Sequence, residues 1–425
     1  MINTQELYQL FEQSYKVSTD TRKITKGCLF FALKGDNFNG NLFAEEALKK
    51  GASYAIVDED VIPSNSIILV DDVLKTLQLL ASYHREQLNI PIIGLTGSNG
   101  KTTTKELINA VLSTKYNTTA TLGNLNNHIG VPLTLLSMTA KTEIGIVEMG
   151  ANHLKEIELL SNITKPDYGY ITNFGKAHLE GFGSLDGVVQ GKTELFKNIK
   201  SRNKTVFINV NDKKQVEHSE GINRITFGNS EADYNIEFVE ANPFVSLKFN
   251  TISIKSKLIG TYNFNNISAA ITIGKHFKVT NESIKVAIEN YIPTNNRSQI
   301  INKGSNQIIL DAYNANPSSM NVALENLSNL SATNKIVILG DMFELGNDSL
   351  QEHQFIADQL DNIDPEKAYL IGEDFYKTTT SSKRIQQFKT FENFKETFIK
   401  TDIQNSTILI KASRGMALER VLDLL

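Results

Sequence analysis

Residues 94–104 combine glycines, a lysine and threonines in an order that suits phosphate binding. The segment reads Gly-Leu-Thr-Gly-Ser-Asn-Gly-Lys-Thr-Thr-Thr, and an apolar run at 90–93 precedes it. Glycines let successive backbone N–H groups point at one anion, and a helix N-terminus adds partial positive charge. Lys101 would reach the β- and γ-phosphates of a nucleotide, and the Thr102 hydroxyl would hold Mg²⁺. The nucleotide-binding residues predicted from this loop are Gly97, Ser98, Asn99, Gly100, Lys101, Thr102 and Thr103.

The loop departs from the general phosphate-loop pattern at one position. The pattern places a glycine five residues before Gly100, where this chain has Leu95. A plain strand–turn–helix could carry the same Gly-Lys-Thr string by chance. The strand expected before the loop and the helix expected at 105–112 favour a site for ATP or GTP.

Three further side chains stand where they could take part in chemistry. Glu148 ends an apolar strand predicted at 144–148, and ligands bind at the carboxyl ends of parallel strands. A Mg²⁺ ligand or a water-holding base would stand at that position. His178 lies in a glycine-flanked loop after another predicted strand, and Lys192 follows a glycine at the expected start of a helix. Taken singly, each of the three is better interpreted as an ordinary solvated side chain.

Asparagine, acidic and basic residues gather in the later loops. Asn263 and Asn266 belong to an asparagine-rich helix start, and helix capping accounts for only one of its asparagines. Asp311 ends an apolar strand and opens a polar loop, although turn chemistry alone could produce its Asn-Pro pair. Two basic residues follow the last predicted strand and could bind a carboxylate. The other candidate binding residues of these two loops are Tyr313, Asn314, Asn316, Lys411 and Arg414.

The composition is that of a soluble globular protein with more than one domain. The 425 residues exceed one ordinary core, and the formal net charge of −4 gives no basic field that would attract nucleic acid. No apolar run approaches the roughly 20 residues that span a membrane, and the N-terminus lacks the features of a signal peptide. Cys28 is the only cysteine, which excludes an internal disulfide. We therefore expect a cytoplasmic protein that neither binds nucleic acid nor inserts into a membrane.

Alternating helical and strand patterns predict an α/β fold in three domains, residues 1–88, 89–293 and 294–425. In the second domain, strand and helix patterns alternate along the chain, which is typical of a parallel sheet. Short alternating patterns within 204–259 suggest an antiparallel extension, and the polar segment Pro293–Ser298 reads as a linker. The expected strands are 28–33, 54–57, 67–70, 90–93, 144–148, 168–172, 307–311, 335–340, 368–372 and 406–411, with 205–210, 224–227, 234–238, 245–249 and 252–254 in the extension.

Taken together, these strings resemble the Mur ligases, ATP-dependent amide-forming enzymes of peptidoglycan precursor synthesis. The resemblance covers nearly the whole chain. Its most type-specific strings, Glu148–Asn152 and Tyr313–Pro317, resemble the member that joins D-alanyl-D-alanine to UDP-N-acetylmuramoyl-tripeptide. The other matching segments are 96–104, 124–136, 172–184, 260–270, 339–346 and 411–414.

The resemblance implies a fold of three domains, and their limits agree with the limits predicted from the helix and strand patterns. A small N-terminal α/β domain would bind the UDP-sugar. A central P-loop-type domain with a mainly parallel sheet would be the ATPase, and a C-terminal Rossmann-like domain would bind the incoming amino compound. The family also implies two Mg²⁺ ions, and we expect a monomer.

Residue roles follow from the resemblance by matching positions. Lys101, Thr102 and Glu148 would handle the phosphates and one Mg²⁺. His178 would bind a second Mg²⁺ together with Lys192, which the family carries as an N-carbamate. A helix start would also favour an anion at Lys192. The remaining implied roles are adenine binding by Asn263 and Asn266, γ-phosphate contact by Arg297, ribose contact by Asp311, uridine binding near Ser18, Asp20 and Arg22, and further substrate contacts by Asn126, Asn127, Tyr313, Asn314, Asn316, Lys411 and Arg414.

The chain departs from its relatives at three places and leaves two other functions open. Asn39-Gly40-Asn41 replaces Asp-Gly-His, Lys176 replaces a proline, and Asn296 replaces a glycine.

The expected chemistry is conversion of a carboxylate to an acyl phosphate, followed by attack of an amine. The alternatives are a related ligase that adds a single amino acid or glutamate, and a non-catalytic nucleotide-binding protein of the same fold.

Overall fold

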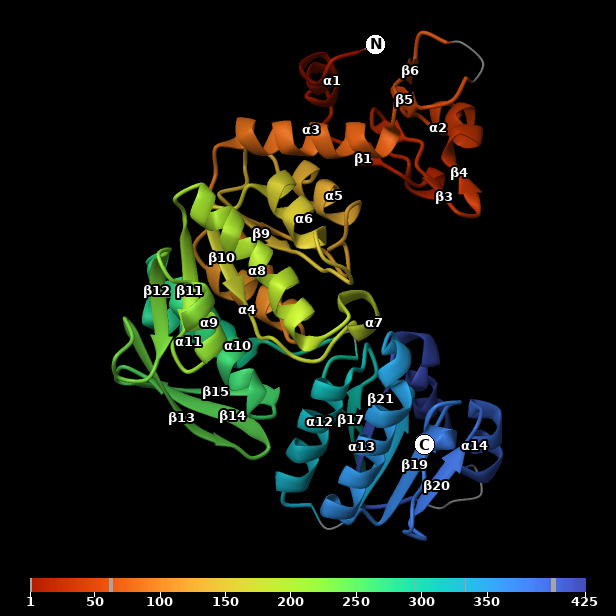
Figure 1. Ribbon diagram of the computed structural model, residues 1–425. Helices are drawn as coiled ribbons and strands as arrows, with labels where there is room; N and C mark the ends of the chain where they lie inside the picture. The colour runs from red at the N-terminus through yellow and green to blue at the C-terminus, as the bar shows by residue number, and fades with distance from the viewer. Residues whose placement is uncertain (1, 61–63, 295, 333, 399–402) are drawn as a thin grey trace.

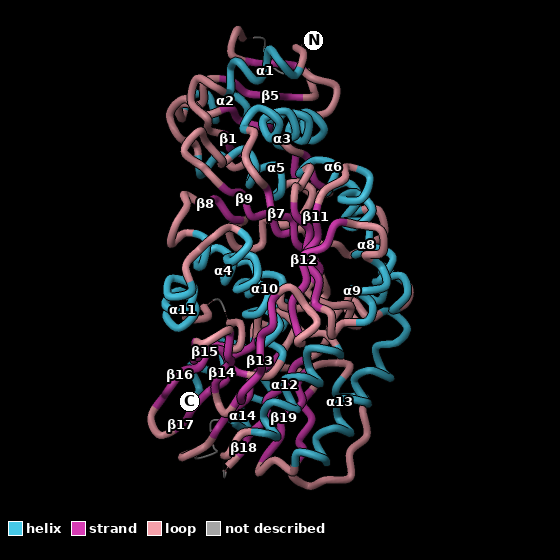
Figure 2. Tube along the Cα trace, turned by 90° about the vertical axis from the view of Figure 1, so that its left-hand side faces the viewer, coloured by secondary structure: helices cyan, strands magenta, loops and turns pink. Residues whose placement is uncertain are grey.

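Three sheets follow one another along the chain. The computed structural model describes residues 2–60, 64–294, 296–332, 334–398 and 403–425. Figure 1 and Figure 2 show the N-terminal unit at one end, the large sheet in the middle and the C-terminal unit at the other end. This arrangement confirms the predicted α/β fold.

The N-terminal unit is a small parallel sheet with strand order β1-β2-β5-β6. Its core strand β2 is fully buried and lies within the strand predicted at 28–33, and the adjacent Cys28 is buried as well. Asn41, one of the departures, is buried and closes a loop, because its side chain donates to Asp58 Oδ1 at 2.9 Å and accepts from the Asp58 amide at 3.0 Å. The elements are α1 (Thr4–Phe11), β1 (Val17–Ser18), β2 (Leu29–Phe31), β3 (Lys34–Gly35), β4 (Phe38–Asn39), α2 (Ala44–Lys49), β5 (Tyr54–Val57), β6 (Ile67–Leu69) and α3 (Val73–Leu88).

The central sheet has nine strands in the order β15-β14-β13-β12-β11-β10-β7-β9-β8. Only β13, β14 and β15 pair in antiparallel fashion. The expectation that 205–210 and 224–227 belong to the antiparallel part is wrong, because helix α9 (Lys213–His218) forms the crossover that parallel strands need. The strands are β7 (Ile92–Thr96), β8 (Thr118–Ala120), β9 (Ile144–Glu148), β10 (Tyr168–Ile171), β11 (Thr205–Asn209), β12 (Asn223–Gly228), β13 (Tyr234–Ala241), β14 (Phe244–Phe249) and β15 (Ile252–Ile259).

Helices cover both faces of the central sheet. Successive residues of β7 point to opposite faces, so Ile92 joins one hydrophobic core and Ile93 the other. The core of Ile92 includes residues of helices α5 (Gly130–Leu136), α6 (Glu156–Thr164) and α8 (Leu185–Ser201), whereas that of Ile93 includes residues of α4 (Lys101–Leu112), α10 (Tyr262–His276) and α11 (Asn281–Asn290). Burial on both faces explains the continuous apolar runs of the parallel strands.

The C-terminal unit is a Rossmann-like sheet with strand order β16-β17-β21-β18-β19-β20. Apart from the antiparallel β16, its strands pair in parallel, and helices pack on both faces. No helix within the described ranges is long and apolar enough to cross a membrane. The elements are β16 (Gln299–Lys303), β17 (Asn306–Asp311), α12 (Pro317–Asn329), β18 (Lys335–Gly340), α13 (Ser349–Ile363), β19 (Lys367–Ile371), β20 (Ile385–Phe388), α14 (Phe391–Phe398) and β21 (Thr407–Lys411).

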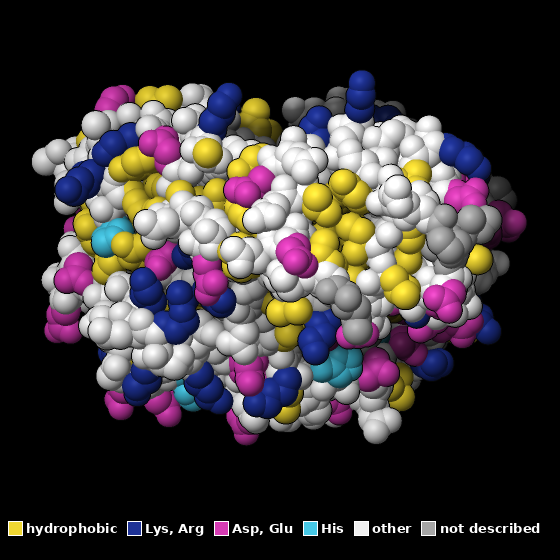
Figure 3. Space-filling view, turned by 90° about the horizontal axis from the view of Figure 1, so that it is seen from above, with side chains coloured by type: hydrophobic (Ala, Val, Ile, Leu, Met, Phe, Trp, Pro, Cys, Tyr) yellow, Lys and Arg dark blue, Asp and Glu magenta, His cyan; other side chains and the backbone are white. Residues whose placement is uncertain are grey.

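The surface at the N-terminal end mixes charges of both signs. In the view of Figure 3, Lys and Arg side chains alternate with Asp and Glu side chains and with small hydrophobic patches. The formal net charge of −4 is consistent with this mixture.

Candidate active site

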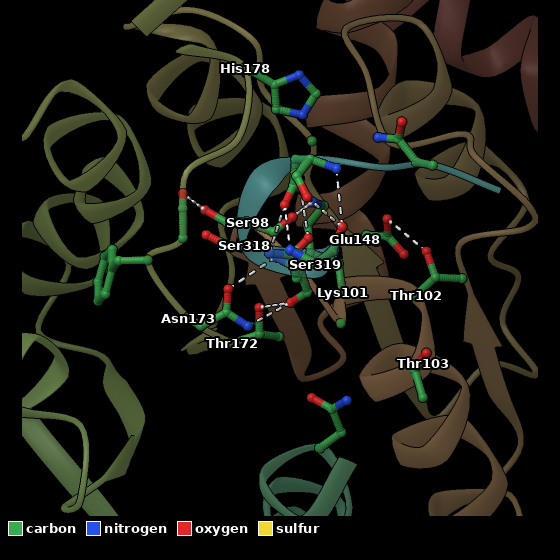
Figure 4. A pocket seen from close by; sticks show the side chains of 18 of the residues that line it. Ser98, Lys101, Thr102, Thr103, Glu148, Thr172, Asn173, His178, Ser318 and Ser319 are labelled. Atoms are coloured by element: carbon green, nitrogen blue, oxygen red, sulfur yellow. Dashed lines mark hydrogen bonds between the residues drawn. The ribbon is translucent and has the colours of Figure 1, made fainter. Parts of the chain in front are cut away.

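A cavity of about 1160 Å³ is lined by residues of both the central and the C-terminal sheets. Figure 4 shows Lys101, Thr102 and Glu148 grouped in it, with Thr172 and Asn173 on one side and His178 on the other. The predicted site residues that line the cavity are Ser98, Asn99, Gly100, Lys101, Thr102, Thr103, Asn126, Asn127, Glu148, His178, Asn266, Arg297, Asp311, Tyr313, Asn314, Asn316 and Lys411. Those outside its lining are Gly97, Asn263, Lys192, Arg414, Ser18, Asp20 and Arg22.

The phosphate loop has the backbone that its glycines predict. Gly97 and Gly100 have φ angles of 145° and 77°, which other residues rarely adopt. A Cβ on Gly97 would lie 2.0 Å from Thr172 Oγ1. Helix α4 begins at Lys101 after Gly100, which offers no capping side chain, so its first N–H groups remain available for an anion.

Lys101 folds back onto this loop. Its ammonium donates to the carbonyl oxygens of Gly97 at 2.7 Å and Ser98 at 3.0 Å. Burial lowers the pKa of Lys101 to about 8, while the nearby Glu148 carboxylate opposes the shift. The lysine is therefore held at the phosphate loop as a cation whose charge depends on pH near neutrality.

Glu148 has one satisfied and one unsatisfied carboxylate oxygen. Its Oε1 accepts hydrogen bonds from Thr102 Oγ1 at 3.2 Å and from Asn126 Nδ2 at 2.8 Å. The side chain is 1% exposed, and Oε2 is buried without a hydrogen-bond partner. A buried carboxylate oxygen without a donor suits a hard cation such as Mg²⁺. Asn126, which the resemblance places at the substrate, thus orients the carboxylate.

His178 is held in a strained turn beside the C-terminal sheet. It precedes α7 (Leu179–Phe182) with a φ of 53°, and its Nδ1 pairs with Glu344 Oε2. The hydrogen bond from His178 lowers the pKa of the Glu344 carboxyl. Within the described residues, no group of three or more His, Cys, Asp and Glu side chains is arranged to hold a metal ion. A Mg²⁺ ion at Glu148 or His178 would therefore also need oxygens from water, nucleotide or a modified side chain.

Lys192 is buried in the middle of a helix. The expectation that it opens a helix is wrong, because α8 begins at Leu185 with Ser184 as its N-cap, so the helix N-terminus does not favour an anion at Lys192. The side chain is fully buried, donates to Ala151 O at 3.1 Å and lies 5.0 Å from the centre of the Phe182 ring. Burial lowers the pKa of Lys192 well below that of an ordinary lysine. Such a site favours the neutral amine.

The asparagines of α10 form a buried chain of hydrogen bonds. Thr104 Oγ1 donates to Asn266 Oδ1 at 3.1 Å, Asn266 Nδ2 donates to Asn263 Oδ1 at 2.8 Å, and Asn263 Nδ2 donates to Ile259 O at 2.7 Å. The capping role expected for one asparagine is wrong, since Thr261 is the N-cap and makes no side-chain cap. Asn263 thus supports Asn266, which faces the cavity.

Two parts of the C-terminal unit complete the cavity wall. The Lys411 ammonium pairs with Asp311 Oδ2, and the Ser298 amide donates to Asp311 Oδ1 at 2.9 Å. The Arg297 guanidinium lies 3.7 Å from the centre of the Tyr313 ring, and its Nε is buried without a hydrogen-bond partner. The structure thus brings predicted residues from separate segments into two pairs, Asp311 with Lys411 and Arg297 with Tyr313, and Arg297 retains a donor for a ligand.

The remaining predicted residues have mainly local contacts. Asn316 caps α12 and donates to Asn99 Oδ1 of the phosphate loop at 2.8 Å, which joins the two units. Arg414 is outside the cavity and pairs with Glu419 at 3.1 Å. The Asn314 side chain accepts from the Ala315 amide at 2.9 Å, and that of Asn127 accepts from the Gly130 amide at 2.9 Å.

The predicted uridine residues lie in the N-terminal unit, away from the cavity lining. Asp20 accepts from the Arg22 amide and from Arg22 Nε, both at 2.9 Å, and Ser18 Oγ donates to the Asp20 carbonyl at 2.9 Å. The three residues form one turn whose polar groups satisfy each other.

Some cavity residues were not predicted from the sequence. Asn209 ends β11 at the same sheet edge as Glu148, and its Nδ2 donates to Asn265 Oδ1 at 3.2 Å. The strand-exit argument used for Glu148 would have found it. Ser318, which lines the cavity, and Glu344, which lies outside its lining, contact the segment around His178 from the C-terminal unit, and no local pattern marks such contacts.

Comparison with known proteins identifies the family. Three family models match: "Mur ligase family, catalytic domain" at residues 14–85, "Mur ligase middle domain" at 95–274 and "Mur ligase, glutamate ligase domain" at 296–414. UDP-N-acetylmuramoyl-tripeptide–D-alanyl-D-alanine ligase of Bacillus subtilis is 35% identical over 97% of this chain and 93% of its own length. The enzyme of that name from Escherichia coli is 33% identical over 95% of this chain and 92% of its own.

Solved structures agree with the sequence relatives. MurF from Acinetobacter baumannii has a TM-score of 0.88 and 30% identity, covering 96% of this chain and 93% of that one. MurF ligase from Thermotoga maritima in complex with ADP has a TM-score of 0.85 and 26% identity, covering 96% of both chains. The resemblance seen in the sequence is confirmed, and the protein belongs to the Mur ligase family.

Proposed function

We propose that the protein is an ATP-dependent ligase, of the acid–D-amino-acid (peptide) ligase class EC 6.3.2, that joins D-alanyl-D-alanine to UDP-N-acetylmuramoyl-tripeptide. The observation that carries the proposal is the shared cavity. One wall holds Lys101 and the unpartnered carboxylate oxygen of Glu148, and the other holds Arg297 and the Asp311–Lys411 pair. Full-length relatives bearing that enzyme name support the choice of substrates.

The chain's residues can hold each partner of an acyl-phosphate reaction. Lys101 and the first N–H groups of α4 would bind the transferring phosphoryl group, and Arg297 would offer its free Nε. The tripeptide carboxylate attacks the γ-phosphorus and ADP leaves. The amine of D-alanyl-D-alanine then attacks the acyl carbon, loses a proton and expels phosphate.

Mg²⁺ would be held by Glu148 and Thr102 at one site, and by His178 with a carbamate on Lys192 at a second. Bound there, the ions would offset negative charge on the phosphates. The depressed pKa of Lys192 supports the modification, because a neutral amine can attack carbon dioxide. The new N–C bond forms as the amine loses a proton, and the side chain becomes an anion that hard Mg²⁺ can accept.

The three domains would divide the substrates among them. Residues 1–88 would bind the UDP-sugar, 89–293 ATP, and 294–425 the amino substrate. Asn266, with Asn263 behind it, would face the adenine, and Asp311 would face the ribose. We also propose that the protein acts in the cytoplasm as a monomer.

Phosphate release tests the proposed reaction. We expect release from ATP only when UDP-N-acetylmuramoyl-tripeptide and D-alanyl-D-alanine are both present, and a panel of lysine- and diaminopimelate-containing tripeptides would show which is used. Release with a single amino acid in place of the dipeptide would indicate a related ligase instead. Binding of nucleotide without release under any pairing would indicate a non-catalytic protein.

A further inference from the structure

The loop that carries His178 is docked onto the C-terminal unit at several points. We define the His178 loop as residues 173–181. The Lys176 amide donates to Ser318 Oγ at 2.8 Å, and Lys176 Nζ donates to Glu352 Oε1 at 2.5 Å. The Glu180 amide donates to the Glu344 carbonyl at 3.1 Å. The conformation of this loop is therefore tied to the position of the C-terminal unit.

Glu344 contacts the loop through both its side chain and its backbone. Its carboxylate pairs with His178 Nδ1, and its carbonyl accepts the Glu180 amide. His178 and Glu344 both have left-handed backbones, with φ angles of 53° and 63°. Such backbones are unfavourable for residues other than glycine, and they concentrate at functional sites where the surrounding contacts hold them. Here the two strained residues hold each other.

The pairing determines how the imidazole can be used. An Nδ1–H that donates to a carboxylate fixes the neutral tautomer whose Nε2 carries the free lone pair. His178 lines the cavity, and among the described residues the only hydrogen bond of its ring is the one at Nδ1. A carboxylate behind a histidine in this way orients the ring and makes it a better metal ligand.

We infer that Glu344 of the C-terminal unit is the positioning residue for the metal-binding nitrogen of His178. The inference rests on the proposed function, which makes His178 a metal ligand. Because Glu344 and His178 belong to different units, the second metal site is complete only while the C-terminal unit lies against the central one. Closure of the amino-substrate domain and assembly of that metal site are thus one event.

The Lys176–Glu352 pair provides a matched comparison. It joins the same loop to the same unit, but it does not touch the His178 ring. Glu344 has a side chain that is 49% exposed, so shortening it leaves no buried cavity. Glu344→Ala removes the acceptor, and Glu344→Gln keeps an oxygen that can accept from Nδ1. Glu352→Ala removes one contact of the same loop and leaves the His178–Glu344 pair and the other docking contacts in place.

The test uses Mn²⁺ as a paramagnetic probe. The full-length protein is loaded with Mn²⁺, a non-hydrolysable ATP analogue and bicarbonate, and electron spin-echo modulation from a ¹⁴N nucleus is recorded. We expect the modulation in the wild type, its absence in His178→Ala, strong loss in Glu344→Ala, partial recovery in Glu344→Gln and no change in Glu352→Ala. The Mg²⁺ concentration for half-maximal activity should rise about 10-fold or more in Glu344→Ala and should stay unchanged in Glu352→Ala.

Each contrary outcome has a separate meaning. Full modulation in Glu344→Ala, or equal loss in Glu352→Ala, would overturn the positioning role while leaving the metal assignment of His178 intact. Tighter Mn²⁺ binding in Glu344→Ala would also overturn it, because Glu344 would then compete with the metal for the ring. A wild type without the ¹⁴N modulation would overturn the metal role of His178 and the inference with it, whereas the ligase reaction could still be assayed by phosphate release.

Discussion

Lys101 and Lys192, two lysines of the central domain, have different surroundings. Lys101 donates to two carbonyl oxygens of its own loop, whereas Lys192 has one carbonyl acceptor and an aromatic ring. Burial lowers the pKa of each. A bound phosphate would favour the charged form of Lys101, whereas the proposed carbamylation would turn the neutral amine of Lys192 into an anion.

Replacement of Lys101 should stop turnover without unfolding the protein. Because Lys101 is held at the phosphate loop, Lys101→Ala should lower substrate-dependent phosphate release by about 10² to 10³-fold, the usual effect of removing one transition-state donor. The exposed Lys141→Ala serves as the control. Near-normal release from a variant with unchanged thermal stability would contradict the role of the loop.

Nucleotide binding should take up a proton at mildly alkaline pH. With the pKa of Lys101 at about 8, part of the free protein holds a neutral amine above that pH, and the phosphates of ATP favour the ammonium. ATP affinity should therefore weaken as the pH rises above about 8. Calorimetry at about pH 8.5 in two buffers of different ionisation enthalpy measures the uptake. An equal uptake in Lys101→Met would assign the proton to another group.

Lys192 should be replaceable in part by a small carboxylate. Lys192→Ala should lose about 10²-fold or more of activity, and acetate should restore part of it by supplying the oxygens that a carbamate would provide. Lys197→Ala, an exposed lysine of the same helix, is the control. Full activity of Lys192→Ala without additive would show that no modified lysine is needed.

At the scale of elements, α3 attaches the N-terminal unit to the central one. It packs on α5 and α6, and Arg85 pairs with Asp167 at 2.6 Å. His84 is fully buried between them: the Tyr8 hydroxyl donates to its Nδ1 at 3.2 Å, and its Nε2 donates to Met138 O at 2.9 Å. Accepting the Tyr8 hydroxyl at Nδ1 requires the neutral ring. The ring thereby joins α1 and α3 to the segment after α5.

Acid should weaken this junction before it affects the rest of the fold. Burial lowers the pKa of His84 below its usual value of 6.5, so the unfolded chain binds the proton more readily. The contribution of His84 is fully present above pH 6.5 and is lost as the pH falls below it. We expect the free energy of unfolding to drop between about pH 7 and pH 5 and to drop less in His84→Gln. An identical slope in the variant would assign the effect elsewhere, for example to His276, whose pKa burial also lowers.

At the scale of the whole molecule, the cavity is lined by residues of both the central and the C-terminal units, so its shape depends on where the C-terminal unit lies. Polar contacts join it to the central unit at Asn99–Asn316 and at Lys176–Glu352. The segment Pro293–Ser298, predicted as a linker, connects the two units, and its Asn295 lies outside the described residues.

Ligands should make the molecule more compact. We expect the radius of gyration, measured by small-angle X-ray scattering, to decrease when an ATP analogue and UDP-N-acetylmuramoyl-tripeptide are both present, since phosphate, uridine and acceptor motifs lie in three separate units. Either ligand alone is the control and should give a smaller change. One unchanged radius under all conditions would contradict domain closure.

The sequence by itself determined the elements and the phosphate loop. Tyr54–Val57, Ile144–Glu148 and Lys335–Gly340 are strands with the predicted limits, because apolar runs bounded by polar residues carry that information locally. Loop chemistry is equally local, so the glycines around Lys101 predicted both its backbone and its place at the helix start.

Only the tertiary structure decided contacts between residues far apart in the chain. Glu344 meets His178 across 166 positions, and Asp311 meets Lys411 across 100. The burial of Lys192 could not be predicted from the sequence either. A lysine after a glycine suggests a helix start, whereas the contacts of Lys192 with Phe182 and Ala151 depend on the fold. Periodicity and short motifs report on neighbours along the chain, whereas the pKa of a lysine, the partner of a carboxylate and the tautomer of a histidine depend on what the fold packs against them.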